Sequence, residues 1–147
     1  MDFSLSEEHL MIRQAARDFA QNELLPGVIE RDDAQKFPAE QIKKLGELGF
    51  LGMMTDTKYN GSGMDTLSYV IAMEELSKVD ASASVVVSVN NSLVCWGLEA
   101  FASEEQKQKY LTRLASGEVI GAFCLSEPEA GSDATSQKTT AIDKGDH

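Results

Sequence analysis

The sequence is short of basic residues, and this shortage excludes one class of function. Lys and Arg together number 13 against 24 Asp and Glu, which gives a formal net charge of −11. A nucleic-acid-binding surface needs a basic stripe to displace counterions from phosphates, and none is present. We therefore expect no nucleic-acid partner. Any anionic ligand should be held by local dipoles or by parts of the protein outside these residues.

Cysteine is also scarce, and the spacing of its two copies argues against a metal or redox site. Cys95 and Cys124 are far apart in sequence, whereas such a site needs closer partners, so we expect no bound metal. Their apolar neighbours predict buried free thiols, which suits a reducing compartment. The first ten residues carry acids where a signal peptide has a basic start and an apolar run, so we expect no export signal and a cytoplasmic location.

Charge is missing altogether from residues 81–98, a run long enough to raise the question of a membrane span. Four serines and two asparagines interrupt it, so we expect no membrane insertion. Its VVVSV motif, Val85 to Val89, favours a strand by propensity, because β-branched side chains are stiff in helices. The length of the run and its position between capped helices favour a central helix that is buried on most sides.

Helix-capping signals fill most of the remaining chain and predict an α-helical bundle over residues 4–115. Ser4 and Glu7 have the spacing of a capping box, in which a hydroxyl and a carboxylate satisfy exposed amides of the first turn. Asp65 and Asp80 can cap two further helices. Ser103 with Gln106 forms a second predicted capping box, and Gly49 and Gly117 are typical helix stops.

The pattern changes after residue 118. VIGAFCLS and TTAID, residues 119–126 and 139–143, read as short strands separated by a loop. Two strands cannot make an independently stable sheet. We therefore expect a helical domain over residues 1–118 and an incomplete β-domain over residues 119–147, with most of the protein lying beyond.

Several candidate residues have simpler structural interpretations. His9 falls on the polar side of the first helix and His147 ends the chain, and neither has a nucleophile or ligand at a useful spacing. YNGSG, residues 59–63, lacks the Lys of a phosphate-binding P-loop, so a turn is favoured. Glu127, Glu129 and Asp133 could supply acid–base chemistry, but acids in a loop are more often solvated or bound to backbone amides.

The loop CLSEPEAGSDATS, residues 124–136, combines features that suit ligand binding. Pro128 stiffens the turn, and Gly131 permits positive φ and close backbone approach. Ser126 and Ser132 offer hydroxyl donors beside backbone N–H groups, which together can bind an anion or a polarised carbonyl without a cationic side chain. These residues support a nucleotide or phosphate cradle and an ordinary turn about equally.

The same loop resembles the first signature of the acyl-CoA dehydrogenases, flavoproteins that desaturate acyl-CoA thioesters between Cα and Cβ. The resemblance extends to MDFSLSEEH, LGFLGMMTDTKYNGSGMD, YVIAMEELSKVDAS, FASEEQKQKYLTRLASGE and IGAFCLSEP, and it is nearest to the short-chain, butyryl-type branch. It implies a mainly α fold: the N-terminal helical bundle domain of that family, followed by the first strands of its middle β-barrel-like domain.

The resemblance also implies an FAD site in this loop. Ser126 would donate near flavin N5, and the backbone amides of Leu125 and Ser126 would hold the pyrimidine edge. Ser132 would lie where the FAD pyrophosphate and the CoA chain meet, so it would also bind substrate. Glu129 replaces the usual small residue and is expected to face solvent. The implied FAD-binding residues are Phe123, Cys124, Leu125, Ser126, Glu127, Pro128, Glu129, Ala130, Gly131 and Ser132.

By the same resemblance, the catalytic base is a glutamate beyond residue 147, so no residue here is expected to be catalytic and the piece alone should be inactive. The implied partners of the full-length protein are an acyl-CoA substrate, an electron-transfer flavoprotein as acceptor, and further copies of the chain in a homotetramer. Two alternatives stay open. One is a truncated, non-catalytic helical module that acts by association, since uncovered strands favour self-pairing. The other is an acyl-CoA oxidase, which uses oxygen.

Overall fold

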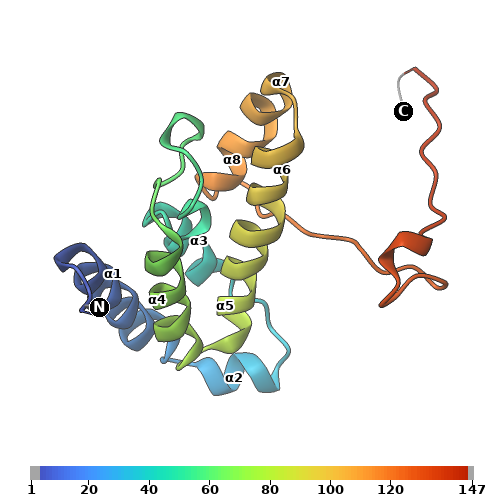
Figure 1. Cartoon of the computed structure of the whole chain (residues 1–147). Coiled ribbons are helices and arrows are strands. Elements are labelled where there is room, and N and C mark those ends of the chain that lie inside the picture. Colours follow the sequence, from blue (N-terminus) through green and yellow to red (C-terminus); the bar gives the residue numbers. More distant parts are fainter. Residues whose placement is uncertain (1–3, 146–147) are drawn as a thin grey trace.

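In the computed structural model, which describes residues 4–145, a helical body is followed by an extended C-terminal segment (Figure 1). This confirms the helical bundle predicted for residues 4–115. The helices are α1 (Glu7–Phe19), α2 (Val28–Asp33), α3 (Ala39–Glu47), α4 (Thr66–Ser77), α5 (Ala81–Ser88), α6 (Trp96–Phe101), α7 (Glu104–Gln106) and α8 (Thr112–Ala115). Ala20–Leu24, Val89–Cys95 and Lys107–Leu111 are π-helical, and Phe50–Gly52, Thr57–Tyr59 and Ala134–Ser136 are 3-10 turns.

The first helix begins two residues later than the sequence suggested. Ser6, and not Ser4, is the N-cap: its hydroxyl accepts a hydrogen bond from the backbone N–H of His9 at 3.2 Å. The Nδ1 atom of the His9 ring accepts a hydrogen bond from the backbone N–H of Ser6 at 3.4 Å, which completes the capping box. The Ser4–Glu7 prediction was therefore wrong, because a histidine takes the place of the Glu or Gln that usually marks this motif.

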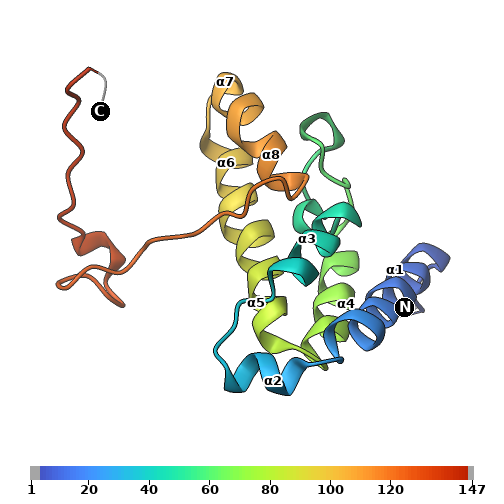
Figure 2. The same ribbon diagram turned by 180° about the vertical axis from the view of Figure 1, so that it is seen from behind.

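The uncharged run is helical, as predicted, and VVVSV forms no strand. The α5 helix, the π-helical segment and α6 make one continuous helix, Ala81–Phe101, that runs the length of the body (Figures 1 and 2). The expectation of burial on most sides was wrong: Val87 and Cys95 are fully buried, but Trp96 and Phe101 are 57% and 80% exposed. This helix is long and apolar enough to span a membrane, but the core helices of soluble proteins can also meet this criterion of length and composition.

The main core lies where α1, α3, α4 and α5 meet the 3-10 turn Phe50–Gly52. The apolar faces of the amphipathic helices α1 and α3 point inward, whereas α4 and α5 are apolar on more than one side and bury only part of that surface. Fully buried members include Leu24, Ile42, Leu45, Leu51 and Leu76. A smaller cluster around Tyr59, Cys95, Leu111 and Leu114 supports the end of the body from which the C-terminal segment leaves.

The expected first strands of a β-domain are absent from the part of residues 119–145 that the structure describes. The segment contains one isolated antiparallel bridge, Glu127 to Ala130, and the 3-10 turn Ala134–Ser136. A strand needs a neighbour to take its ladder hydrogen bonds. VIGAFCLS and TTAID do not pair with each other, and the segment runs away from the helical body (Figure 2). The β-strand prediction for these residues is therefore not supported.

Candidate functional site

The loop Phe123–Ser132 is organised around a tight reverse turn. The backbone N–H of Glu127 donates to the carbonyl of Ala130 at 3.0 Å, and the N–H of Ala130 donates back at 3.1 Å. Pro128 occupies the second position of this turn, where its fixed φ stiffens the chain. The turn holds Glu127 and Ala130 together by bonds within the loop itself.

Of the three acids Glu127, Glu129 and Asp133, the first and the last accept hydrogen bonds from neighbouring residues of the C-terminal segment. The Glu127 carboxylate accepts hydrogen bonds from the backbone N–H groups of Thr139, at 3.1 Å, and Lys138, at 2.7 Å, and these bonds lower its pKa. The hydroxyls of Ser136 and Thr135 lower the pKa of Asp133 in the same way. A carboxyl group held in its charged form is a poor general acid, so the structural interpretation of these acids is favoured.

The remaining polar groups of the loop have no acceptor inside the described chain. The Ser126 and Ser132 side chains are exposed, and neither makes a hydrogen bond to another described residue. The backbone N–H groups of Leu125 and Ser126 are likewise not donated to any described carbonyl. Such a set of amides and hydroxyls fits a ligand edge rich in carbonyl or phosphate oxygens. Glu129 is exposed, as expected.

Gly131 does not have the role that the sequence suggested. The glycines with positive φ in the described chain are Gly27, Gly49, Gly63, Gly117 and Gly145, so Gly131 is not among them. A Cβ built at Gly131 would meet no atom within 4 Å. In this conformation the position therefore requires neither positive φ nor close backbone approach.

The YNGSG motif is a turn, as predicted, and its amides are already used. The backbone N–H of Gly61 donates to Asp56 O at 3.3 Å, and that of Ser62 donates to Gly52 O at 2.8 Å. Gly63 N–H donates to Thr55 O at 2.9 Å. A phosphate-binding loop needs such N–H groups to be free, so this loop cannot serve as one.

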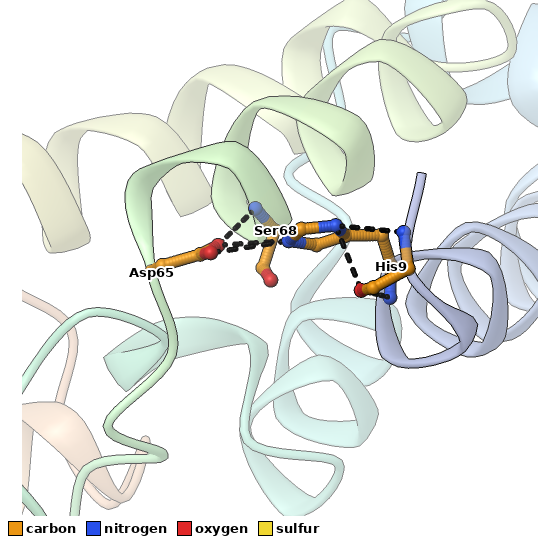
Figure 3. Close-up of polar contacts among 4 residues, drawn as sticks. His9, Asp65 and Ser68 are labelled. Atoms are coloured by element: carbon orange, nitrogen blue, oxygen red, sulfur yellow. Dashed lines mark hydrogen bonds and ion pairs between the residues drawn. The ribbon is translucent and has the colours of Figure 1, made fainter. Parts of the chain in front are cut away.

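His9 connects the start of α1 to the start of α4 (Figure 3). Its Nδ1 accepts from Ser6, so Nε2 carries the proton that points to Asp65, 3.1 Å from Oδ2. Asp65 is the N-cap of α4, as predicted, and accepts from the backbone N–H of Ser68 at 2.7 Å. The Ser68 and His9 bonds lower the pKa of Asp65 to about 2. His9 is thus a structural residue, and His147 lies outside the described residues.

The two cysteines differ in environment. Cys95 is buried, as predicted, and burial raises the pKa of its thiol to about 11. Cys124 is exposed, so the prediction that it is buried was wrong, because the loop that carries it packs against no core. Within residues 4–145 no group of three His, Cys, Asp or Glu side chains is placed to hold a metal ion.

One hollow of the described chain lies away from this loop. It has a volume of about 550 Å³ and is lined by residues of α2, of the following connection and of the start of α5, including Ile29, Phe37, Val79 and Val86. None of the residues of the loop borders it. The loop is therefore an exposed surface in this chain, and a ligand bound there would need further walls.

The helical domain defines the class of protein. Residues 6–118 match the family description "Acyl-CoA dehydrogenase, N-terminal domain". The chain belongs to the acyl-CoA dehydrogenase family, and the family resemblance of its motifs is confirmed.

Among the relatives within this family are short-chain and butyryl-CoA dehydrogenases. The short-chain-specific acyl-CoA dehydrogenase of Clostridium acetobutylicum is 47% identical over 147 residues, which is 100% of this chain and 39% of the relative. Butyryl-CoA dehydrogenase from Megasphaera elsdenii superposes with a TM-score of 0.89 at 41% identity, covering 95% of this chain and 37% of that one. A chain solved in work on the electron transferring flavoprotein of Acidaminococcus fermentans reaches a TM-score of 0.94 at 49% identity, covering 99% and 38%.

A further relative carries the cofactor. The acyl-CoA dehydrogenase from Bacillus anthracis complexed with FAD superposes with a TM-score of 0.85 at 34% identity, covering 92% of this chain and 23% of that one. The chain thus spans 39% or less of the length of each of these relatives.

Proposed function

We propose that this chain is the N-terminal region of an FAD-dependent acyl-CoA dehydrogenase that desaturates short-chain acyl-CoA between Cα and Cβ. The observation that carries the proposal is the loop Phe123–Ser132, in which the backbone amides of Leu125 and Ser126 and the two serine hydroxyls have no acceptor within the described chain. The identity of 47% to a short-chain-specific relative over the whole chain supports the choice of substrate class. In that setting residues 1–118 form the helical domain and residues 119–147 begin the next one.

The residues of the loop have separate tasks under this proposal. FAD, when bound, accepts the hydride that leaves the substrate. Ser126 donates a hydrogen bond near flavin N5, and the amides of Leu125 and Ser126 hold the pyrimidine edge, where negative charge is best stabilised by fixed donors. Ser132 binds at the junction of the FAD pyrophosphate and the CoA chain. Glu129 faces solvent and so avoids repelling the phosphates.

The remaining machinery is proposed to lie outside these 147 residues. We assign the catalytic base to a glutamate of a later helix, and the other walls of the flavin site to further domains. The electron acceptor is an electron-transfer flavoprotein, and the complete protein is a cytoplasmic homotetramer. The 147 residues alone should therefore purify without yellow colour and should not oxidise butyryl-CoA.

The test compares serine variants in the complete protein. Ser126→Ala should weaken FAD binding or slow flavin reduction by butyryl-CoA, because it removes a donor worth ~0.5–1.5 kcal/mol, and more where charge develops in a dry site. Ser132→Ala should raise the Kd for FAD and the KM for acyl-CoA more than it lowers kcat. Ser82→Ala, an exposed serine of α5 without a hydrogen bond through its side chain, is the matched control.

The readouts are flavin absorbance, stopped-flow reduction and turnover with a dye acceptor or with oxygen. Unaltered FAD binding and reduction in both loop variants would contradict the assignment of the site. Efficient turnover with oxygen would instead indicate an oxidase. Stoichiometric FAD in the 147-residue chain would show that the site is complete without further domains.

One observation favours a second candidate, a module that acts by association. Trp96 and Phe101 form an edge-to-face pair with ring centroids 5.7 Å apart, and both are largely exposed. Large exposed aromatics are typical of surfaces that another chain covers. Sedimentation of the 147-residue chain and of a Phe101→Ser variant tests this: concentration-dependent association that the substitution abolishes would support it.

A further inference from the structure

Asn90 is a buried amide that joins three separate parts of the chain. It lies in the π-helical segment Val89–Cys95 and has an exposed fraction of 0%. Its amide group donates to the carbonyls of Leu51, at 2.7 Å, and Leu114, at 3.1 Å. Its carbonyl oxygen accepts from the backbone N–H of Gly121 at 2.9 Å. Since a buried amide is costly unless its groups are paired, all three bonds matter for where these segments lie.

Gly121 is the point at which the C-terminal segment leaves the helical body. A Cβ at this position would lie 2.5 Å from Cγ1 of Val94 and 3.0 Å from its Cβ. Only glycine therefore allows the backbone to approach the helix closely enough to bond to Asn90. A second bond, from Val119 N–H to Arg113 O at 3.2 Å, holds the preceding residues against α8.

Asn91 is the matched neighbour that lacks this link. It is also buried, and its amide donates to the carbonyls of Phe50, at 2.8 Å, and Val87, at 2.9 Å. Its carbonyl oxygen accepts from the backbone N–H of Met53 at 2.7 Å, so all its partners lie within the helical body. Each asparagine donates to two backbone carbonyls and accepts from one backbone N–H, and Asn90 has a further contact with Cys95 Sγ at 3.6 Å. Only Asn90 reaches the segment that carries the loop.

We infer that Asn90 is a positioning residue. Through its bond to Gly121, it fixes where the segment that carries the loop Phe123–Ser132 leaves the helical domain. The free amides of Leu125 and Ser126 follow Gly121 by four and five residues, so the Asn90 bond limits how far they can move from the body. None of the side-chain hydrogen bonds of Asn90 reaches the loop Phe123–Ser132. The role in cofactor binding rests on the proposed function, whereas the positioning itself does not.

The first test uses the 147-residue chain and no cofactor. In NMR hydrogen exchange, the Gly121 amide should exchange at least tenfold more slowly than those of Leu125 and Ser126. Asn90→Ala and Asn91→Ala should lower the urea midpoint by similar amounts, but only Asn90→Ala should release the Gly121 amide and reduce the residual dipolar couplings of residues 119–123. An unprotected Gly121 amide in the wild-type chain, or its equal release by Asn91→Ala, would overturn the inference.

A second variant set leaves the buried asparagines and the fully buried core side chains in place. Gly121→Ala leaves Asn90 in place but forces the segment away from Val94, so it should release the segment by itself. Adding Val94→Ala makes room for the new methyl group and should restore protection of the amide. Gly97→Ala is the control, because a Cβ there meets no atom within 4 Å. Release by Gly121→Ala without rescue by Val94→Ala would contradict the proposed packing.

The same set is then placed in the complete flavoprotein. Gly121→Ala should raise the Kd for FAD at least tenfold, and the Val94→Ala pair should recover most of that loss, whereas Gly97→Ala should change nothing. A complete protein that binds no FAD at all would defeat the proposed function and leave the exchange result intact. Normal FAD binding by Gly121→Ala, with the segment released, would show that this bond does not position the site.

Discussion

The pairing of α1 with α4 depends on a carboxylate that is almost fully buried. Glu75, 4% exposed, accepts from Arg17 Nε at 3.0 Å and Nη2 at 3.1 Å, and from Lys78 Nζ at 2.9 Å. These bonds lower the pKa of Glu75 to about 2, with the Arg17 bonds as the largest cause. We predict that Glu75→Gln destabilises the chain, because Arg17 loses its charged acceptor and Lys78 keeps only its contact with Glu74, at 3.1 Å.

The size of the effect follows from the geometry. A hydrogen bond to a charged group contributes ~1.5–3 kcal/mol, but the two cations are about half exposed and can turn to water, so we expect a loss of ~1–2 kcal/mol. With a urea m-value of ~1.5 kcal/mol/M, the unfolding midpoint should fall by about 1 M. Arg17→Met should be at least as harmful, since it leaves Glu75 buried with one partner fewer.

The assay is a double-mutant cycle on Arg17 and Glu75, measured by urea unfolding and circular dichroism. A second cycle on Lys43 and Glu47 is the control, because that pair is 4.0 Å apart and well exposed and should couple by less than ~0.5 kcal/mol. Because the folded pKa of Glu75 is lowered, its contribution is complete above pH 4.5 and is lost as pH falls towards 2. Equal coupling in both cycles at pH 7, or coupling at Glu75 that survives unchanged near pH 2, would refute this account.

Three further predictions concern the 147-residue chain. At pH 8, the exposed Cys124 should react readily with a thiol reagent, whereas Cys95 should react only in denaturant, because it is fully buried and its pKa is raised. Rapid reaction of both thiols without denaturant would contradict the fold around Cys95. Asp80→Ala should lower unfolding free energy by ~1–2 kcal/mol in chemical denaturation, because it removes the N-cap of α5. Gly61→Ala should give poorly folded protein by circular dichroism, because its Cβ would overlap the Thr55 backbone; a native spectrum would show that this turn can adjust.

The helical body was predictable because its signals are local. Asp65, Asp80 and the Ser103–Gln106 box cap helices where expected, since a cap needs only residues within one turn. The first box was misplaced because its returning side chain is His9, which the common Glu or Gln pattern does not include. The one-sided burial of the central helix was missed for another reason: composition shows that a helix is apolar but not which of its faces another element covers.

The structure of the loop and its surroundings depends on contacts between residues that are distant in sequence. A strand is defined by a partner, so VIGAFCLS could not become one without a neighbour, whatever its propensity. Asn90 was noted in the sequence only as a polar interruption of an apolar run, although its side chain bonds directly to the segment that carries the loop. No spacing rule connects positions 31 residues apart. A buried amide in an otherwise apolar helix is nevertheless a usable signal, because such a group persists only where distant backbone groups meet it.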